Sequence, residues 1–192
     1  MAPAQITDPQ QWVARYADQL YSYALARLDN EEQARDLVQE TFLAALEGLN
    51  QFKGNSTEQT WLTAIMKHKV IGVYRSRNSG LQAEPLGREP LGREPEAEFF
   101  ESENGHWKMA YAPQAFGFGG AELLAQKELA AILTKCLQKL PALWHSIFAM
   151  KHMDDTETKT ICKELKVSNA NFWVIIHRAK LHLRSCIQKE WI

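Results

Sequence analysis

The chain has 192 residues, of which 45% are hydrophobic and 23% charged, so it can bury a core and is not globally disordered. Its formal net charge of −1 excludes a uniformly basic nucleic-acid coat but permits a local basic patch. No basic residue precedes an apolar run at the N-terminus, and no apolar run approaches the roughly 20 residues that span a bilayer. We expect a soluble, cytoplasmic protein with no membrane insertion.

The first part of the chain predicts three helices. An N-cap signal at Asp8 starts a helix that runs to about Leu28. Asn30 caps a second helix, in which apolar residues recur with a period near 3.6. A third helix begins near Ser56 and ends before Asn78.

The middle of the chain reads as a linker. Seven of the ten glycines and four of the seven prolines lie between residues 80 and 120. Residues 78–126 carry eight acidic and three basic side chains, whereas residues 127–192 carry six acidic and eleven basic ones. We therefore predict two small helical domains, 8–79 and 122–192, joined by a flexible acidic linker, 80–121.

Helical patterns return after the linker, and no convincing run of alternating strand residues occurs, so the predicted fold class is all-α. One helix ends near Leu140 and Pro141 starts the next. A short helix to about Lys166, a tight turn and a longer helix from Ser168 to about Gln188 have the pattern of a helix-turn-helix. Lys166 stands where a turn glycine is common, which implies a left-handed lysine.

The outward face of the last helix carries amides and cations that could read base edges and hold phosphates. The alternative is an ordinary helical hairpin with a solvated basic face. The candidate DNA-binding residues are Ser168, Asn169, Asn171, Trp173, His177, Arg178 and Lys180.

The third helix combines cations with aromatic side chains and has no acidic residue from Trp61 to Arg77. Stacking on bases and contacts with phosphates are what single-stranded DNA requires. The alternative is that Trp61 belongs to the core and the lysines only solubilise the helix. The candidates are Phe52, Trp61, Lys67, His68, Lys69, Tyr74, Arg75 and Arg77.

The second helix places Asp36 and Glu40 four residues apart on one face, beside Gln39. Such a pair could be an acid–base pair, a metal site or a docking surface for a basic partner. No histidine or third carboxylate stands at ligand spacing, so we predict neither a catalytic nor a metal site, and no cofactor.

The three cysteines are far apart and have no CxxC spacing. We therefore expect no disulfide scaffold, and a reducing compartment. Cys136, Cys162 and Cys186 fall on apolar faces, where buried thiols are common. His182 and Cys186 could form one edge of a metal site, but no second pair lies nearby in the sequence.

Several of these motifs together resemble a known family. The segments Asp36–Phe42, Phe52–Gly54 and Trp61–Ile65, with Tyr74 and Arg75, resemble region 2 of bacterial extracytoplasmic-function (ECF) sigma factors. Leu140-Pro141, the helix-turn-helix and the segment 177–184 resemble region 4. Gly72 stands where the family usually has an aspartate, and Arg35 where it often has a glutamate.

The resemblance implies a partner for each surface. The second helix would dock on the clamp helices of core RNA polymerase through Asp36, Gln39, Glu40, Phe42 and Leu43. The third helix and the loop before it, including Lys53 and Asn55, would hold the minus-10 strand of promoter DNA. The last helix would enter the minus-35 element. Residues 171–174, with Cys186 and Trp191, are similar to a subgroup often paired with a zinc-binding anti-sigma protein.

The sequence thus predicts a sigma initiation factor that is not an enzyme. The alternative is a stand-alone helix-turn-helix transcriptional regulator. A regulator would bind its operator alone, whereas a sigma factor would need core polymerase.

Overall fold

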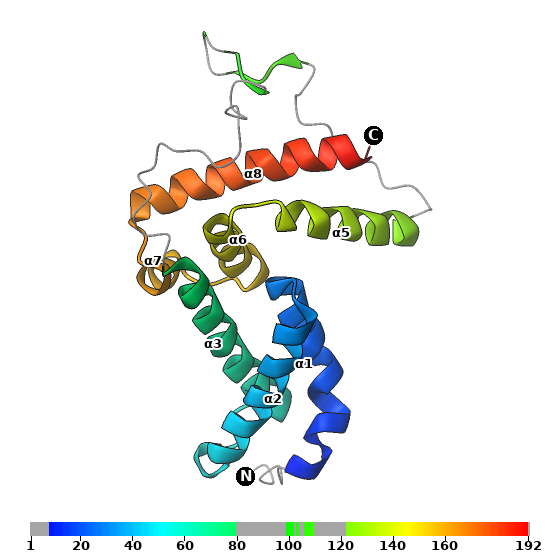
Figure 1. Ribbon diagram of the computed structural model, residues 1–192, viewed down its shortest axis with the longest axis vertical. Coiled ribbons are helices and arrows are strands. Elements are labelled where there is room, and N and C mark those ends of the chain that lie inside the picture. The colour runs from blue at the N-terminus through cyan, green and yellow to red at the C-terminus, as the bar shows by residue number, and fades with distance from the viewer. Residues whose placement is uncertain (1–7, 80–98, 102, 104–105, 110–121, 192) are drawn as a thin grey trace. The chain divides into compact units, whose positions relative to one another are not determined.

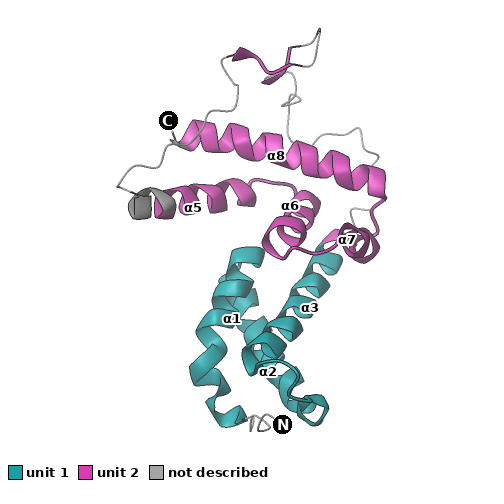
Figure 2. Cartoon of the chain, turned by 180° about the vertical axis from the view of Figure 1, so that it is seen from behind, with its two compact units in different colours: residues 1–77 teal, residues 78–192 magenta. Residues whose placement is uncertain are grey.

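The computed structural model describes residues 8–79, 99–101, 103, 106–109 and 122–191, without the side chains of 122–126 and 191. The chain divides into two compact units, 1–77 and 78–192 (Figure 2). Regular secondary structure in the described part is helical, which confirms the predicted fold class. None of the helices in that part has the length and apolarity to cross a membrane.

Unit 1 is a three-helix body whose helices begin and end close to the predicted positions. Its elements are a 3-10 turn Pro9–Gln11, α1 Trp12–Leu28, α2 Glu31–Glu47, a 3-10 turn Leu49–Gln51 and α3 Glu58–Asn78. Asp29 ends α1 in the left-handed conformation, with φ 52°. The Asn30 side chain then accepts a hydrogen bond from the Gln33 backbone N–H, which starts α2 as predicted.

Polar contacts at both ends of α3 fix it against α1. At one end, Glu58 accepts hydrogen bonds from Trp12 Nε1 at 3.0 Å and from the Tyr16 hydroxyl at 2.9 Å. At the other end, the Tyr74 hydroxyl donates to the Arg27 carbonyl at 3.0 Å and the Arg77 guanidinium donates to the Leu28 carbonyl. Because these last two side chains satisfy carbonyls at the C-terminus of α1, they hold the helix bundle together.

Unit 2 contains four α-helices in its described part (Figure 1). They are α5 Glu122–Gln138, α6 Ala142–Phe148 with a following π-helical turn Ala149–Met153, α7 Thr158–Leu165 and α8 Asn169–Trp191. Lys166 adopts the left-handed conformation at the end of α7, with φ 53°, as the sequence predicted. The helix-turn-helix pattern therefore corresponds to α7, this turn and α8.

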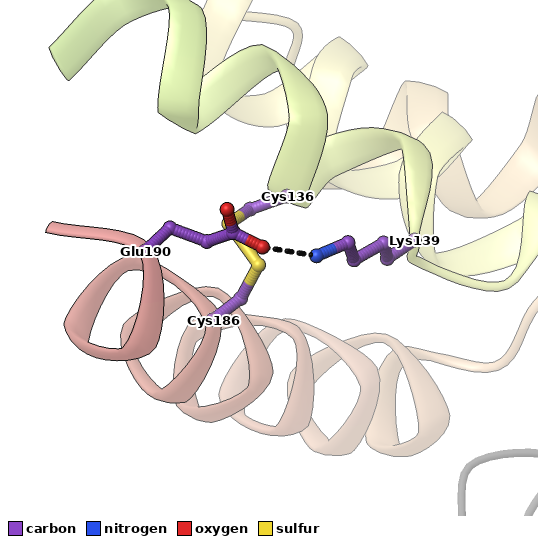
Figure 3. Close-up of a disulfide and its surroundings, with 4 residues drawn as sticks. All are labelled: Cys136, Lys139, Cys186 and Glu190. Atoms are coloured by element: carbon purple, nitrogen blue, oxygen red, sulfur yellow. Dashed lines mark hydrogen bonds and ion pairs between the residues drawn. A yellow bond between two sulfur atoms is a disulfide. The ribbon is translucent and has the colours of Figure 1, made fainter. Parts of the chain in front are cut away.

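A disulfide joins Cys136 of α5 to Cys186 of α8 (Figure 3). The expectation that all three cysteines are reduced thiols is therefore wrong for two of them, and Cys162 is the free one. The two paired residues are 50 positions apart, and only the packing of α5 on α8 brings their Cα atoms to 5.8 Å. The bridge lies in a buried cluster with Leu137, Leu140, Ala179 and Leu183.

The described part of the expected linker contains an ordered segment. Phe100 and Trp107 form an antiparallel bridge, closed by hydrogen bonds from Glu101 N to His106 O and from Lys108 N to Phe99 O, each 2.9 Å. Phe99 is only 1% exposed. We call the residues Phe99, Phe100, Trp107 and Lys108 the aromatic hairpin. Phe99 of the expected linker is thus buried, and the rest of 80–121 lies outside the described residues.

Candidate functional site

The outer face of α2 carries both polar and apolar side chains. Asp36, Gln39 and Glu40 are exposed, and Leu43 on the same side is 61% exposed. Phe42 is half-buried at the edge of this face. The opposite side of α2 carries the buried residues Ala34, Leu37, Thr41 and Ala45.

Leu46 belongs to the same outer face and was missed in the sequence. The apolar periodicity assigns it to the buried stripe, yet its side chain is 49% exposed. Successive residues of a helix are about 100° apart. Around the helix, Leu46 therefore lies closer to Gln39 and Leu43 than the buried Ala45 does. Two exposed leucines therefore lie beside two carboxylates on this face of α2.

The exposed side of α3 carries part of the predicted basic surface. His68 and Arg75 are exposed, and Lys67 is half-buried beside them. Tyr74 is fully buried, so the structure corrects its placement on a DNA-facing surface, whereas Arg77 is exposed and its guanidinium donates to the Leu28 carbonyl of α1. The sequence did not show that Tyr74 is buried, because a tyrosine can serve either as a base-stacking group or as a cap on a neighbouring helix.

The aromatic residues near the start of α3 pack on one another. Trp61 is half-buried, with its ring centroid 4.7 Å from that of Phe52 and 5.9 Å from that of Trp12. Lys53 and Asn55 are exposed in the loop between, where Gly54 has φ 70°. Trp61 therefore packs against Phe52 of the loop, and Lys53 and Asn55 are the side chains that the loop exposes.

An ion pair connects the two surfaces of unit 1. Lys69 Nζ of α3 lies 3.0 Å from Glu40 Oε2 of α2. The Lys69 side chain is 25% exposed and that of Glu40 is 56% exposed. A pair so open to solvent contributes well under about 1 kcal/mol, so both groups remain available to a ligand.

The predicted DNA-binding residues of α8 occupy two edges of the helix. At about 100° per residue, Trp173, His177 and Lys180 lie on one edge, and Asn171 and Arg178 lie on the other. All three residues of the first edge are exposed, whereas the two on the second are half-buried. The structure thus does not bring the whole set into one patch.

The start of α8 is built as the turn of the motif requires. The Ser168 hydroxyl accepts a hydrogen bond from the Asn171 backbone N–H at 3.2 Å, while Ser168 and Asn169 remain exposed. Asn171 is half-buried one turn into the helix. These residues stand at the helix N-terminus, where backbone N–H groups favour an anion such as a phosphate.

Basic side chains lie near the edge of α8 formed by Trp173, His177 and Lys180. The pKa of His152 is lowered, first by burial and then by the positive charges of Lys180 and Lys151. Lys180 of α8 is therefore one of two cations near His152, which lies in the segment after α6. In the described part of the chain, no group of three histidine, cysteine or carboxylate side chains could hold a metal ion.

Comparisons with known proteins agree with the helical arrangement. Residues 12–80 match the family described as Sigma-70 region 2. A probable RNA polymerase sigma factor of Haemophilus influenzae is 34% identical over 177 residues, which cover 90% of this chain and 86% of that protein. The ECF RNA polymerase sigma factor SigW of Bacillus subtilis is 25% identical over 88% of this chain and 83% of its own length.

One solved structure matches most of the chain at low similarity. It is the sigma factor RpoE in complex with the anti-sigma factor NepR from Bartonella quintana. That chain is 16% identical, with a TM-score of 0.44 and coverage of 93% of this chain and 96% of its own.

Proposed function

The chain belongs to the ECF RNA polymerase sigma factors, which direct transcription initiation, and we propose which of its surfaces bind core polymerase and promoter DNA. Its role is regulatory, and we propose that it acts in the cytoplasm without catalysing a reaction. The observation that carries the proposal is the outer face of α2, where two leucines lie exposed beside carboxylates.

This face is the surface proposed to bind core polymerase. Leu43 and Leu46 would provide apolar contact area, and Asp36 and Glu40 would choose a basic partner surface and speed its approach. These leucine side chains are exposed to water in the free chain, so burial against a partner would remove their apolar surface from water. Gln39, between the carboxylates, would add a hydrogen bond.

Pull-down of core polymerase tests this surface. We expect Asp36→Lys to abolish capture and Leu43→Ala to weaken it about tenfold, the effect of losing one buried leucine contact of roughly 1.4 kcal/mol. The matched controls are Asp18→Lys and Val13→Ala, since Asp18 is exposed on α1 and Val13 is 61% exposed. Normal capture by both α2 variants would contradict the proposal.

The exposed side of α3 and the loop before it are proposed to hold the minus-10 strand. His68, Arg75 and Lys67 would contact phosphates, and Phe52 and Asn55 would hold an unstacked base. We expect the pair Lys67→Ala and Arg75→Ala to reduce strand opening, measured by permanganate reactivity, with polymerase capture unchanged. Arg35→Ala removes an exposed cation from α2 and is the control. Equal opening by both would contradict the assignment.

The N-terminal part of α8 is proposed to read the minus-35 element. Lys180→Ala and Asn171→Ala test its two edges separately, because the residues lie on opposite sides of the helix. Run-off transcription with core polymerase and genomic fragments gives the promoter, and point changes in its minus-35 sequence then report which edge reads bases. Lys189→Ala, at the exposed far end of α8, is the control. Unchanged promoter choice in both edge variants would contradict the proposal.

The same experiment separates a sigma factor from a stand-alone regulator. We expect specific transcription only when core polymerase is present. We also propose an anti-sigma partner that covers the α2 and α8 surfaces. Co-purification of the tagged chain from its native cell tests this, and recovery of polymerase alone would contradict it.

A further inference from the structure

The aromatic hairpin is packed on α8 rather than left in solvent. The Arg184 guanidinium lies 4.1 Å from the centroid of the Trp107 ring and 5.4 Å from that of Phe99. Within the hairpin, the rings of Phe100 and Trp107 pack on each other, with their centroids 4.4 Å apart. A cation held over two aromatic rings is a specific contact, since both attraction and burial favour it.

Burial along α8 shows which side the hairpin covers. Phe172, Ile176, Ala179 and Leu183 face the core of unit 2 and are buried. Leu181 points about 180° away from Phe172 on the helix, yet it is only 5% exposed. Figures 1 and 2 both show the hairpin segment and α5 on opposite sides of α8. The outward side of the C-terminal half of α8 is therefore covered.

The covered side continues the proposed DNA-binding edge. Trp173, His177, Lys180 and Arg184 recur at spacings of four, three and four residues, so they form one stripe along the helix. The first three are exposed and the fourth lies under the aromatic hairpin. Arg184 lies about 6 Å along the helix axis from Lys180. This distance is about half the width of the major groove, which is about 12 Å.

We propose that the aromatic hairpin is an autoinhibitory strap, which covers the C-terminal end of the DNA-binding edge of α8 in the free chain. The hairpin covers Arg184, one helical turn beyond Lys180, and it holds a cation that could contact a phosphate at the end of this edge. The acidic residues Glu101 and Glu103 lie between Phe100 and Trp107 in the sequence, and they repel a polyanion. The inference rests on the proposed DNA-binding role of α8.

The test measures binding of the full chain to a fluorescent random-sequence DNA duplex at low salt, without polymerase. We expect Trp107→Ala to bind about fivefold more tightly than the unchanged chain, which corresponds to the loss of one cation–aromatic contact that competes with DNA. Arg184→Lys keeps the positive charge but loses the planar group that stacks on the rings, so we expect tighter binding here also. Met109→Ala is the matched control, because Met109 follows the hairpin and is 93% exposed.

Equal or weaker binding by both Trp107→Ala and Arg184→Lys, with helix content preserved by circular dichroism, would overturn the strap. Faster hydrogen exchange at residues 177–184 in Trp107→Ala would support it, and unchanged exchange there would count against it. Run-off transcription with core polymerase is measured in parallel. Absence of transcription with the unsubstituted chain would refute the proposed function. Normal transcription, together with no gain in DNA affinity in the two variants, would refute the strap alone.

Discussion

Reduction of the disulfide is expected to destabilise unit 2 selectively. The bridge between Cys136 and Cys186 closes a loop with a sequence separation of 50. In the chain-entropy treatment such a loop restricts the unfolded chain by about 14 cal/mol/K, or about 4 kcal/mol at 25 °C. Reduction is a cleaner perturbation than substitution because it removes the bond without deleting atoms from the buried cluster around it. A pocket of about 250 Å³ beside the bridge is lined by both cysteines.

Hydrogen exchange with and without reductant measures the effect. In the most protected amides of α5 and α8, about 4 kcal/mol corresponds to a loss of protection of roughly a thousandfold. Unit 1 contains no cysteine, so its peptides provide an internal reference. Cys162→Ser is the matched control, since it removes the free thiol and leaves the bridge intact. Equal protection in both states, or three thiols that react before reduction, would refute the reasoning.

Three further predictions concern single positions. Gly72→Ala in α3 is expected to raise the free energy of unfolding by about 1 kcal/mol in urea titration, because an added Cβ meets nothing within 4 Å; a loss of stability would show that the helix needs the glycine. Glu58→Ala is expected to cost about 2 kcal/mol in the same assay, as it strips the acceptor from Trp12 and Tyr16, and a loss no larger than that of Glu58→Gln would contradict this. Because the pKa of His152 is lowered from 6.5 in the folded chain, the unfolded chain binds its proton first, and stability is expected to fall as the pH drops below about 6.5. The pH dependence of unfolding should flatten in His152→Gln, and an unchanged slope would contradict the assignment.

Local signals in the sequence were sufficient for the helices. Asn30 caps α2 as its side-chain chemistry predicts, and Lys166 takes the left-handed turn that ends α7. Both features depend on residues a few positions apart, so they can be read without knowledge of the tertiary structure. The carboxylate face of α2 was also found from spacing alone, although the exposure of Leu46 was not.

Features that depend on distant contacts were not predictable in this way. Nothing near Cys136 indicates that α8 packs on α5 and brings Cys186 within bonding distance. Tyr74 has the residue type of a base-stacking group, but its hydroxyl satisfies a carbonyl at the end of another helix. The aromatic hairpin lies in a stretch whose glycine and proline content predicts a linker, and Arg184 on α8 gives its rings a packing surface.

The Lys69–Glu40 ion pair gives unit 1 an electrostatic link between α2 and α3. A cation from a partner that engages Glu40 leaves the lysine ammonium without its carboxylate, and a phosphate that engages Lys69 frees the carboxylate in the same way. Thermodynamic reciprocity requires each of these events to favour the other by an equal factor. Through this ion pair, binding of a ligand to one helix thus changes the affinity of the other helix for its own ligand, with no movement of the backbone.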